Sequence, residues 1–300
     1  MQLAEDPEAP LADLDSASQA RAIEMGYDWL YYRYLDHKAD PATTPAKLRR
    51  LLIRRSAYAE ADNRRAPPQP ATDPAQSHRT MMWQTGGGHE QDQGYLALDY
   101  RPAYHDLLDD EAGYRQGAAI DFLHGQVRYR PEDRQLELQQ FTLVHIDSLA
   151  PRNDFLKPTS WNLGVGARRV AVDRQGRFSR RESHLAGYLE GGVGVTAQPD
   201  AGMLCHAVLQ QSLQGGKALE DGWRFGIGPR AGCRYQGRRG QWLGQVEALW
   251  FNDSAQVETS VEAGYQWNLD KDNGLRVEAR YQAADGSDWH GLSLGWRHYY

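Results

Sequence analysis

Alternation of apolar and polar side chains with a period of two residues constrains this chain more than any other feature, and it runs from residue 78 to the C-terminus. Residues 274–283 read GLRVEARYQA, and residues 256–267 read QVETSVEAGYQW. Because successive side chains of a β-strand point to opposite faces, this pattern predicts strands with one apolar and one polar face.

The alternating segments are long and follow one another directly. Turn sequences such as Asp272-Asn273-Gly274 and Asp285-Gly286 separate them and favour hairpins. Each segment spans about 10 to 14 residues, whereas strands usually average about five or six. This organisation predicts an all-β fold, a closed antiparallel up-and-down barrel of about twelve strands. The predicted strands are 78–88, 93–102, 118–130, 134–147, 159–172, 184–197, 201–211, 222–235, 241–251, 256–267, 274–283 and 289–300.

The composition of the polar face indicates that it lines the interior of the barrel. Residues 224–234 read RFGIGPRAGCR, so that glycine is interspersed with charged residues there. Glycine makes room for opposite charges to pair across a narrow lumen, whereas a solvated exterior does not need it. The predicted lumen residues are Glu190, Arg224, Arg230, Glu247, Glu258, Glu262, Arg276, Glu278 and Arg280.

The apolar face is then expected to contact lipid. Aromatic residues near strand ends on this face match the girdles of a transmembrane barrel. They are Trp161, Trp223, Trp242, Trp250, Trp267, Tyr281 and Trp296. The mean hydropathy of −0.73 is compatible with such a barrel, because only one face of each strand is apolar. Alternation alone would also fit a soluble barrel with an apolar interior, which stays open as an alternative.

The C-terminus resembles the signal by which outer-membrane barrels are recognised for insertion. The last predicted strand ends in an aromatic residue, and Leu292, Leu294, Trp296 and Tyr300 share one face. We therefore expect the barrel-insertion machinery and outer-membrane lipid as partners. The net charge is −6, and basic residues do not cluster with aromatic ones, so nucleic acid is not an expected partner.

The first 77 residues follow a different pattern. Apolar residues recur at helical spacing from Asp15 to His37. A second helix is predicted to begin with Thr44 as its N-cap and Pro45 at its first position. The aromatic residues of the first helix are expected to pack within their own domain rather than on a partner. The predicted domains are a helical periplasmic adaptor at 1–60, a Pro-rich linker at 61–77 and a transmembrane β-barrel at 78–300.

Two polar clusters lie in predicted turns, HDLLDD at 105–110 and HIDS at 145–148. They allow an acid/base, metal-binding or hydrolase interpretation, but neither has a recognised metal-ligand spacing. Acidic residues in turns usually cap backbone amides or are solvated. We therefore expect no catalytic residue, metal or other cofactor here, and assign a structural or docking role. The residues assigned to this docking turn and its surroundings are Arg101, Tyr104, His105, Asp106, Asp109, Asp147, Arg152 and Trp161.

If the N-terminal helices are periplasmic, strand parity places both turns on the periplasmic side. They are the longest predicted interruptions, whereas ordinary outer-membrane barrels keep short turns there. The two cysteines, Cys205 and Cys233, lie on the apolar face. A turn centred near residue 216 would separate them by about 20 Å along the ladder, so no disulfide is predicted.

The turn and strand sequences also resemble a known family. The runs RPAYHDLLDDEAGY, IDFLHGQVRYRPEDRQLELQQF and DGWRFGIGPRAG, with QARAIEMGYDWLYYRYL in the first helix, are similar to the C-terminal region of Gram-negative envelope proteins. These proteins carry an Lnb-type periplasmic domain, named for a lipoprotein N-acyltransferase. The resemblance implies a catalytic Cys/His-type part upstream of Met1. No cysteine precedes Cys205, so no catalytic residue is transferred.

These observations favour an outer-membrane β-barrel in a Gram-negative bacterium, with periplasmic helices. Its expected role is to anchor and orient an upstream periplasmic domain that acts on lipoproteins or envelope lipid. A small-solute channel or transport barrel is the first alternative. An outer-membrane lipid hydrolase or acyltransferase is the second.

Overall fold

The computed structural model describes residues 2–58, 72–173, 175, 177–253 and 257–300. The chain divides into two compact units, Met1–Gln69 and Pro70–Tyr300. None of the described helices is long and apolar enough to cross a membrane. Residues 61–71 of the predicted linker 61–77 lie outside the described residues, and the 3₁₀ turn Pro74–Gln76 lies in its remaining part.

The N-terminal unit contains the short helix α1 (Gln2–Glu5) and two longer helices, α2 (Ser16–Leu35) and α3 (Thr44–Ser56). Asp15 caps α2 by accepting a hydrogen bond from the Ser18 backbone N–H at 2.9 Å. Ile23 of α2 and Leu51 of α3 are fully buried in the shared core. Two aromatic residues of α2, Tyr27 and Trp29, pack against this core, whereas Tyr31 and Tyr32 are exposed.

The predicted N-cap of α3 is wrong by one residue. Thr43 is the N-cap, and Thr44 is the first helical residue. The reason lies in the preceding turn, where the Asp40 carboxylate accepts hydrogen bonds from the Ala42 backbone and the Thr43 hydroxyl. These bonds turn the chain earlier than the Thr-Pro sequence suggests.

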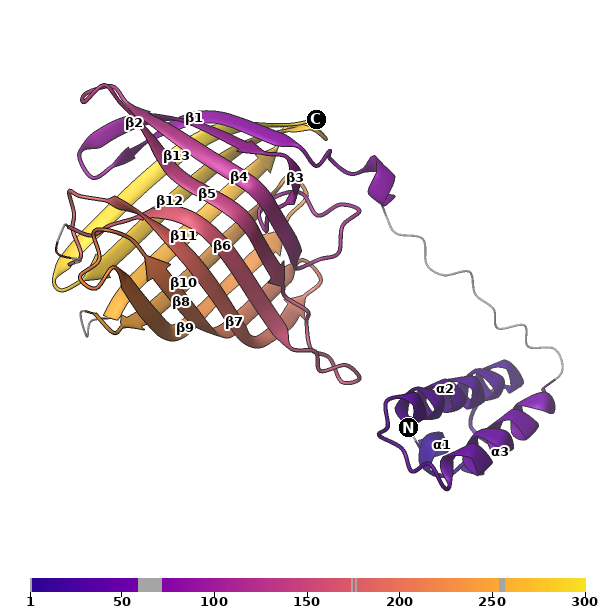
Figure 1. Ribbon diagram of the computed structural model, residues 1–300. Coiled ribbons are helices and arrows are strands. Elements are labelled where there is room, and N and C mark those ends of the chain that lie inside the picture. The colour runs from indigo at the N-terminus through magenta and orange to yellow at the C-terminus, as the bar shows by residue number, and fades with distance from the viewer. Residues whose placement is uncertain (1, 59–71, 174, 176, 254–256) are drawn as a thin grey trace. The chain divides into compact units, whose positions relative to one another are not determined.

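The second unit is the predicted closed antiparallel barrel (Figure 1). Its strands are β1 (Met82–Glu90), β2 (Gln93–Arg101), β3 (Ala103–His105), β4 (Ala118–Arg130), β5 (Gln135–Ser148), β6 (Ser160–Val170), β7 (His184–Asp200), β8 (Met203–Gly215), β9 (Trp223–Gln236), β10 (Gly240–Phe251), β11 (Val257–Asn268), β12 (Asn273–Ala284) and β13 (Ser287–Tyr299). Each strand pairs with its sequence neighbour, and the β1–β13 and β2–β4 pairings close the sheet.

The extra thirteenth strand is a continuation of β2. Pro102 has no backbone N–H and interrupts the ladder, after which β3 pairs with β4 through Ala103 and Phe122. The twelve long strands lie where the alternation predicts them, and no boundary differs by more than four residues.

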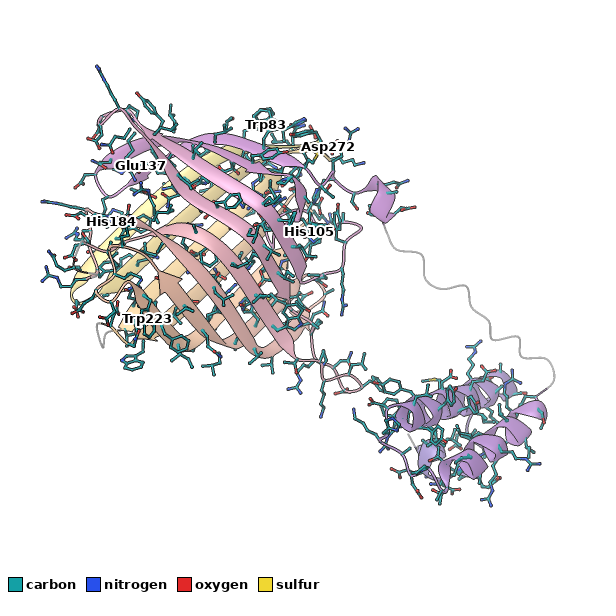
Figure 2. All side chains as sticks on the ribbon, in the orientation of Figure 1. Trp83, His105, Glu137, His184, Trp223 and Asp272 are labelled. Carbon is teal, nitrogen blue, oxygen red and sulfur yellow. A yellow bond between two sulfur atoms is a disulfide. The ribbon has the colours of Figure 1, made fainter. Side chains whose placement is uncertain are left out.

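The two faces of the barrel wall differ in chemistry. Along β8 the inward residues are buried and include His206, Gln210 and Ser212, whereas the outward Leu209 and Leu213 are exposed. All seven aromatic residues predicted for the girdles are exposed on the outside; Figure 2 labels Trp223 among them. The outer wall is therefore apolar and the interior polar, which excludes the soluble-barrel alternative.

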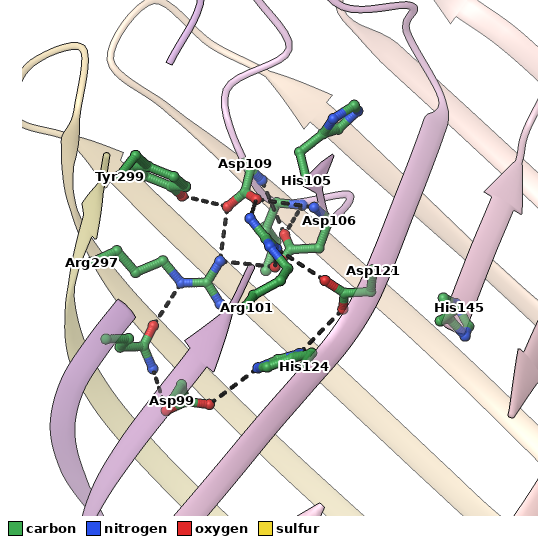
Figure 3. Close-up of polar contacts among 12 residues, drawn as sticks. Asp99, Arg101, His105, Asp106, Asp109, Asp121, His124, His145, Arg297 and Tyr299 are labelled. Carbon is green, nitrogen blue, oxygen red and sulfur yellow. Dashed lines mark hydrogen bonds and ion pairs between the residues drawn. The ribbon is translucent and has the colours of Figure 1, made fainter. Parts of the chain in front are cut away.

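The barrel has two ends, which differ in their connections. We call the end where β1 begins and β13 ends the terminal end, and the opposite one the far end. The expectation that the terminal end carries the longest connections is wrong, because 171–183 at the far end is longer than 106–117 or 149–159. The physical reason is that β6 ends at Val170, before its predicted boundary, which lengthens the connection that follows. The terminal-end connection 106–117 differs in another respect, since it folds into the lumen (Figure 3).

The prediction about the cysteines is also wrong. Cys205 of β8 and Cys233 of β9 are direct register partners and form a disulfide. The strands extend to Gly215 and from Trp223, so the turn is centred near residue 219 rather than 216. A shift of three residues in the centre moves the partner of Cys205 by six positions. Both cysteines do lie on the outward face, as expected.

Because both cysteines are in the disulfide, the reactivity of the protein toward thiol reagents should depend on reduction. The folded, oxidised protein should react with no thiol reagent until a reductant is added, after which two thiols should react. A maleimide mass shift measured in detergent, with and without reductant, tests this, and Cys205→Ser with its single free thiol is the control. A labelled Cys233 in the untreated wild-type protein would contradict the pairing.

Candidate functional site in the barrel lumen

The connection between β3 and β4, residues 106–117, folds into the barrel at the terminal end, and we call it the plug turn. Its backbone and side chains contact strands on opposite sides of the wall. The Leu107 carbonyl accepts a hydrogen bond from Arg234 of β9 at 3.1 Å, and Gln236 donates to Asp110 at 2.9 Å. Asp106 meets Arg276 of β12 on the other side. The plug turn therefore crosses the lumen.

Asp106 and Asp109, near the start of the plug turn, are held by three arginines from the wall, of which Figure 3 labels Arg101 and Arg297. Asp109 accepts from Arg101 of β2 at 2.5 Å and from Arg297 of β13 at 2.8 Å. Asp106 accepts from Arg276 at 2.7 Å and from Arg297 at 2.8 Å. The Tyr299 hydroxyl adds a bond of 2.5 Å to Asp109. These side chains form one connected network.

Burial makes this network matter for stability. The side chains of Arg101 and Asp109 are 0% exposed, and those of Arg276 and Arg297 are 3% and 4% exposed. A buried charge is tolerated only when it is paired, and removing one partner of such a pair usually costs about 3–5 kcal/mol. The network therefore holds the plug turn in place as long as both carboxylates are ionised.

Ionisation of both carboxylates is favoured by the same contacts. Burial opposes the charge on Asp106, but the guanidinium groups of Arg276 and Arg297 outweigh it and hold its pKa well below the ordinary value. Burial likewise opposes the charge on Asp109, and Arg101 leads the arginines that lower its pKa. Both carboxylates therefore stay charged in mildly acidic solution.

Apolar contacts complete the seat of the plug turn. Leu107 is buried with Ala119, Leu149 and the partly buried Leu243 of β10. Leu108 lies directly against Gly264 of β11, where a Cβ atom would come within 2.4 Å of the leucine side chain. A side chain at position 264 would force the end of the Leu108 side chain to shift.

The segment that leads into β1 is bonded to the same turn. The Ser77 hydroxyl donates to the Ala112 carbonyl at 2.5 Å, and the Tyr114 hydroxyl donates to the His78 carbonyl at 2.9 Å. The His78 ring packs against Tyr114 and Tyr299, with ring centroids 5.1 and 4.5 Å away. The point where the chain enters the barrel is therefore fixed by the plug turn.

A cavity of about 370 Å³ lies in the lumen, and Asp106, Leu107 and Leu108 of the plug turn form part of its wall. All nine residues predicted for the lumen line it. Arg168 pairs with Glu190 at 2.9 Å, and Arg224 pairs with Glu258 at 2.5 Å. Glu247 and Glu278 are different, because neither forms an ion pair or hydrogen bond within the described part of the chain.

The residues assigned to the docking turn are only partly brought together. Arg101, Asp106 and Asp109 join in the charge network, and His105 packs on Tyr114 beside it. The others lie apart from the network. Tyr104 and Trp161 are exposed on the wall, Arg152 lies in the connection 149–159, and Asp147 pairs with His145 at 3.0 Å in the lumen.

The second polar cluster does not form a hydrolase site. His145 points into the lumen and lines the cavity (Figure 3). Ser148 has the opposite strand parity and is the backbone register partner of Trp161 in β6. Among the residues that the structure describes, no group of three or more His, Cys, Asp or Glu residues could hold a metal ion.

Arg234, Arg297, Tyr299 and Glu111 also belong to the site, although they were not among the predicted site residues. Arg297 and Tyr299 lie on the inward face of the last strand, and Arg234 of β9 forms an ion pair with Glu111 of the plug turn. The alternation of the strands shows that Arg234, Arg297 and Tyr299 lie on the polar face of the wall. It does not show that they contact the plug turn, because strand periodicity says nothing about where a connection folds.

Comparisons with known proteins give two family matches. A model described as "Domain of unknown function (DUF7840)" matches residues 71–299, and one described as "Domain of unknown function (DUF7842)" matches residues 1–67. None of the curated proteins matches the chain.

Several solved barrels are similar in structure. An outer membrane channel from Pseudomonas putida F1 is 8% identical with a TM-score of 0.45, covering 81% of this chain and 100% of its own. An anion-selective porin from Comamonas acidovorans is 11% identical with a TM-score of 0.35, covering 75% and 100%. OmpT of Vibrio cholerae is 10% identical with a TM-score of 0.36, covering 73% and 96%. At these values the similarity carries no information about function.

Proposed function

The chain belongs to the DUF7840 family, and we propose that the barrel covered by this family model is a closed outer-membrane anchor. It would hold and orient a periplasmic domain on its N-terminal side that acts on lipoproteins or envelope lipid. The observation that carries this proposal is the buried network of Asp106 and Asp109 with three wall arginines, which fixes the plug turn across the lumen.

Two further observations support an anchor over a pore. Ser77 and His78 are bonded to the plug turn, so the chain leaves the barrel at a fixed point, which suits the orientation of an attached domain. The disulfide between Cys205 and Cys233 suits the oxidising periplasm through which an outer-membrane protein passes. The resemblance to envelope proteins with an Lnb-type domain supplies the class of the attached domain.

Conductance tests the closed state. In planar bilayers the intact barrel is expected to give no steady open level, because the plug turn is held by buried ion pairs. Recordings are made on the refolded full chain, with a porin in the same bilayer as the positive control. Large, steady openings of the wild-type protein would contradict the anchor and support a porin-like role.

The genomic reading frame upstream of Met1 tests the attached domain. A signal peptide followed by a domain with a Cys/His-type site, in frame with this chain, is the expected result. A stop codon directly upstream would remove the domain that the barrel is proposed to hold.

A small-solute channel is the second candidate, and the lumen cavity favours it. The cavity of about 370 Å³ has room for a small solute, and Glu247 on its wall is a charge without an ion-pair partner among the described residues. In this case the plug turn would be a gate, and liposome-swelling assays would show solute entry with the wild-type protein.

A further inference from the structure

Helix α3 presents an outward face that the N-terminal unit does not cover. Its inner face buries Thr44, Leu48 and Leu51 in the core of the unit. At the helical step of about 100° per residue, the exposed residues of α3 fall on a single arc. They are Pro45, Ala46, Arg49, Arg50, Leu52, Ile53 and Ser56.

Two large apolar side chains lie on this arc among cations. Leu52 and Ile53 are 51% and 61% exposed. Arg49 and Arg50 are also exposed and lie one turn before Ile53, so they flank it on the helix surface. At about 100° per residue Arg49 falls between Leu52 and Ile53, and Arg50 lies beyond Ile53, so apolar and cationic side chains share this face. Exposed apolar side chains beside cations suit a helix that lies on an anionic bilayer.

The charged residues of α3 are all basic. The segment 44–58 contains five basic residues and no acidic residue, whereas residues 1–40 contain nine acidic and three basic residues. Arg54 and Arg55 are used within the unit, where they bond to the Pro7 carbonyl and the Glu24 carboxylate. Arg49 and Arg50 project from the outward face instead. They are the charges that a partner surface would meet.

A bilayer is always within reach of this face. Twenty-five residues separate the end of α3 at Ser56 from the start of β1 at Met82. Even fully extended, such a segment spans at most about 90 Å. The membrane that holds the barrel is therefore present at a high local concentration around α3, whereas a free partner would have to be recruited from solution.

We propose that the outward face of α3 binds the surface of an anionic phospholipid bilayer, with Leu52 and Ile53 entering the headgroup region and Arg49 and Arg50 meeting the lipid phosphates. This binding would hold the N-terminal unit on the membrane surface. It is independent of the anchor proposal, because it requires only that the barrel be inserted in a bilayer.

The test uses the full chain reconstituted in vesicles. Ile53→Cys is labelled with an environment-sensitive dye while the native cysteines stay in their disulfide. In phosphatidylcholine vesicles with 30% phosphatidylglycerol, the dye is expected to shift to shorter wavelength and to be quenched by spin-labelled lipid. In pure phosphatidylcholine it should do neither. Salt at 1 M, where the Debye length is about 3 Å, should reverse the shift.

Charge variants separate contact with anionic lipid from contact with protein. Each cation near an anionic surface contributes about a fivefold change in binding, so Arg49→Glu with Arg50→Glu should weaken membrane association by at least about 25-fold. Arg49→Lys with Arg50→Lys should retain it, and a label on Asp13→Cys in the acidic segment should report less insertion. Equal emission in both vesicle types would overturn the proposal. A shift without lipid quenching would overturn it as well, because the face would then be covered by protein.

Discussion

Asp106→Asn combined with Asp109→Asn is expected to open the barrel and to lower its heat resistance. The double variant keeps the size of both side chains but removes both negative charges from the lumen network. Arg101, Arg276 and Arg297 then remain buried without their main partners. Breaking a buried ion pair in this way usually costs about 3–5 kcal/mol.

In the double variant, the free energy cost of the unpaired buried arginines is lower when the plug turn leaves the lumen than when it stays in place. The wall arginines keep second partners, because Arg101 also bonds to Asp121 and Arg297 to Gln84. Water that enters the lumen can solvate the guanidinium groups once the turn has left. We therefore expect step-like conductance in planar bilayers where the wild-type protein gives none, and a lower temperature of unfolding in heat-modifiable gel migration.

Asp110→Asn is the matched control, because Asp110 lies in the same turn but outside the arginine network and accepts only from Gln236 among the described residues of the wall. It should leave the barrel closed. If the double variant inserts poorly, Tyr299→Phe removes one bond to Asp109 and should give brief openings at normal insertion. A double variant that inserts, stays closed and melts like the wild type would show that the network does not hold the plug.

The strands of this protein were predictable because their signal is local. Each strand repeats its pattern every two residues, as in Val257 to Trp267 and Leu275 to Tyr281, so that the strands and the two faces of each follow from the sequence, with boundaries to within four residues. Even the nine lumen residues lie on the cavity wall, because parity places them on one face and the glycines and charges of that face indicate that it is the inner one.

The plug and the disulfide were not predictable, because both depend on how distant segments meet. The run HDLLDD looks like a solvated turn, and only the arginines on β2, β12 and β13 make it a lumen element. The pairing of Cys205 with Cys233 depended on the centre of one turn, where an error of three residues displaced the partner by six. Strand periodicity carries no information on either point.

The environments of the two faces of the wall can be distinguished by placing an arginine on each face of the same strand and comparing the stability of the two variants. Val261 and Ser260 are neighbours near the middle of β11, with Val261 exposed on the outer face and Ser260 lining the lumen cavity. Val261→Arg puts a charge into lipid, which near the bilayer midplane destabilises a transmembrane barrel by about 2–4 kcal/mol. Ser260→Arg places the same side chain between Glu258 and Glu262, whose carboxylates lie on the same face.

Denaturant unfolding in phospholipid vesicles should therefore show a clear loss of stability for Val261→Arg and a small change for Ser260→Arg. The adjacent position controls for strand propensity and for the size of arginine, so the difference between the two variants reports the environment of each face. In a water-soluble barrel the order would be reversed, because an arginine on the outer face would be solvated and one in a packed interior would not. Equal losses for both variants would contradict a lipid-facing outer wall.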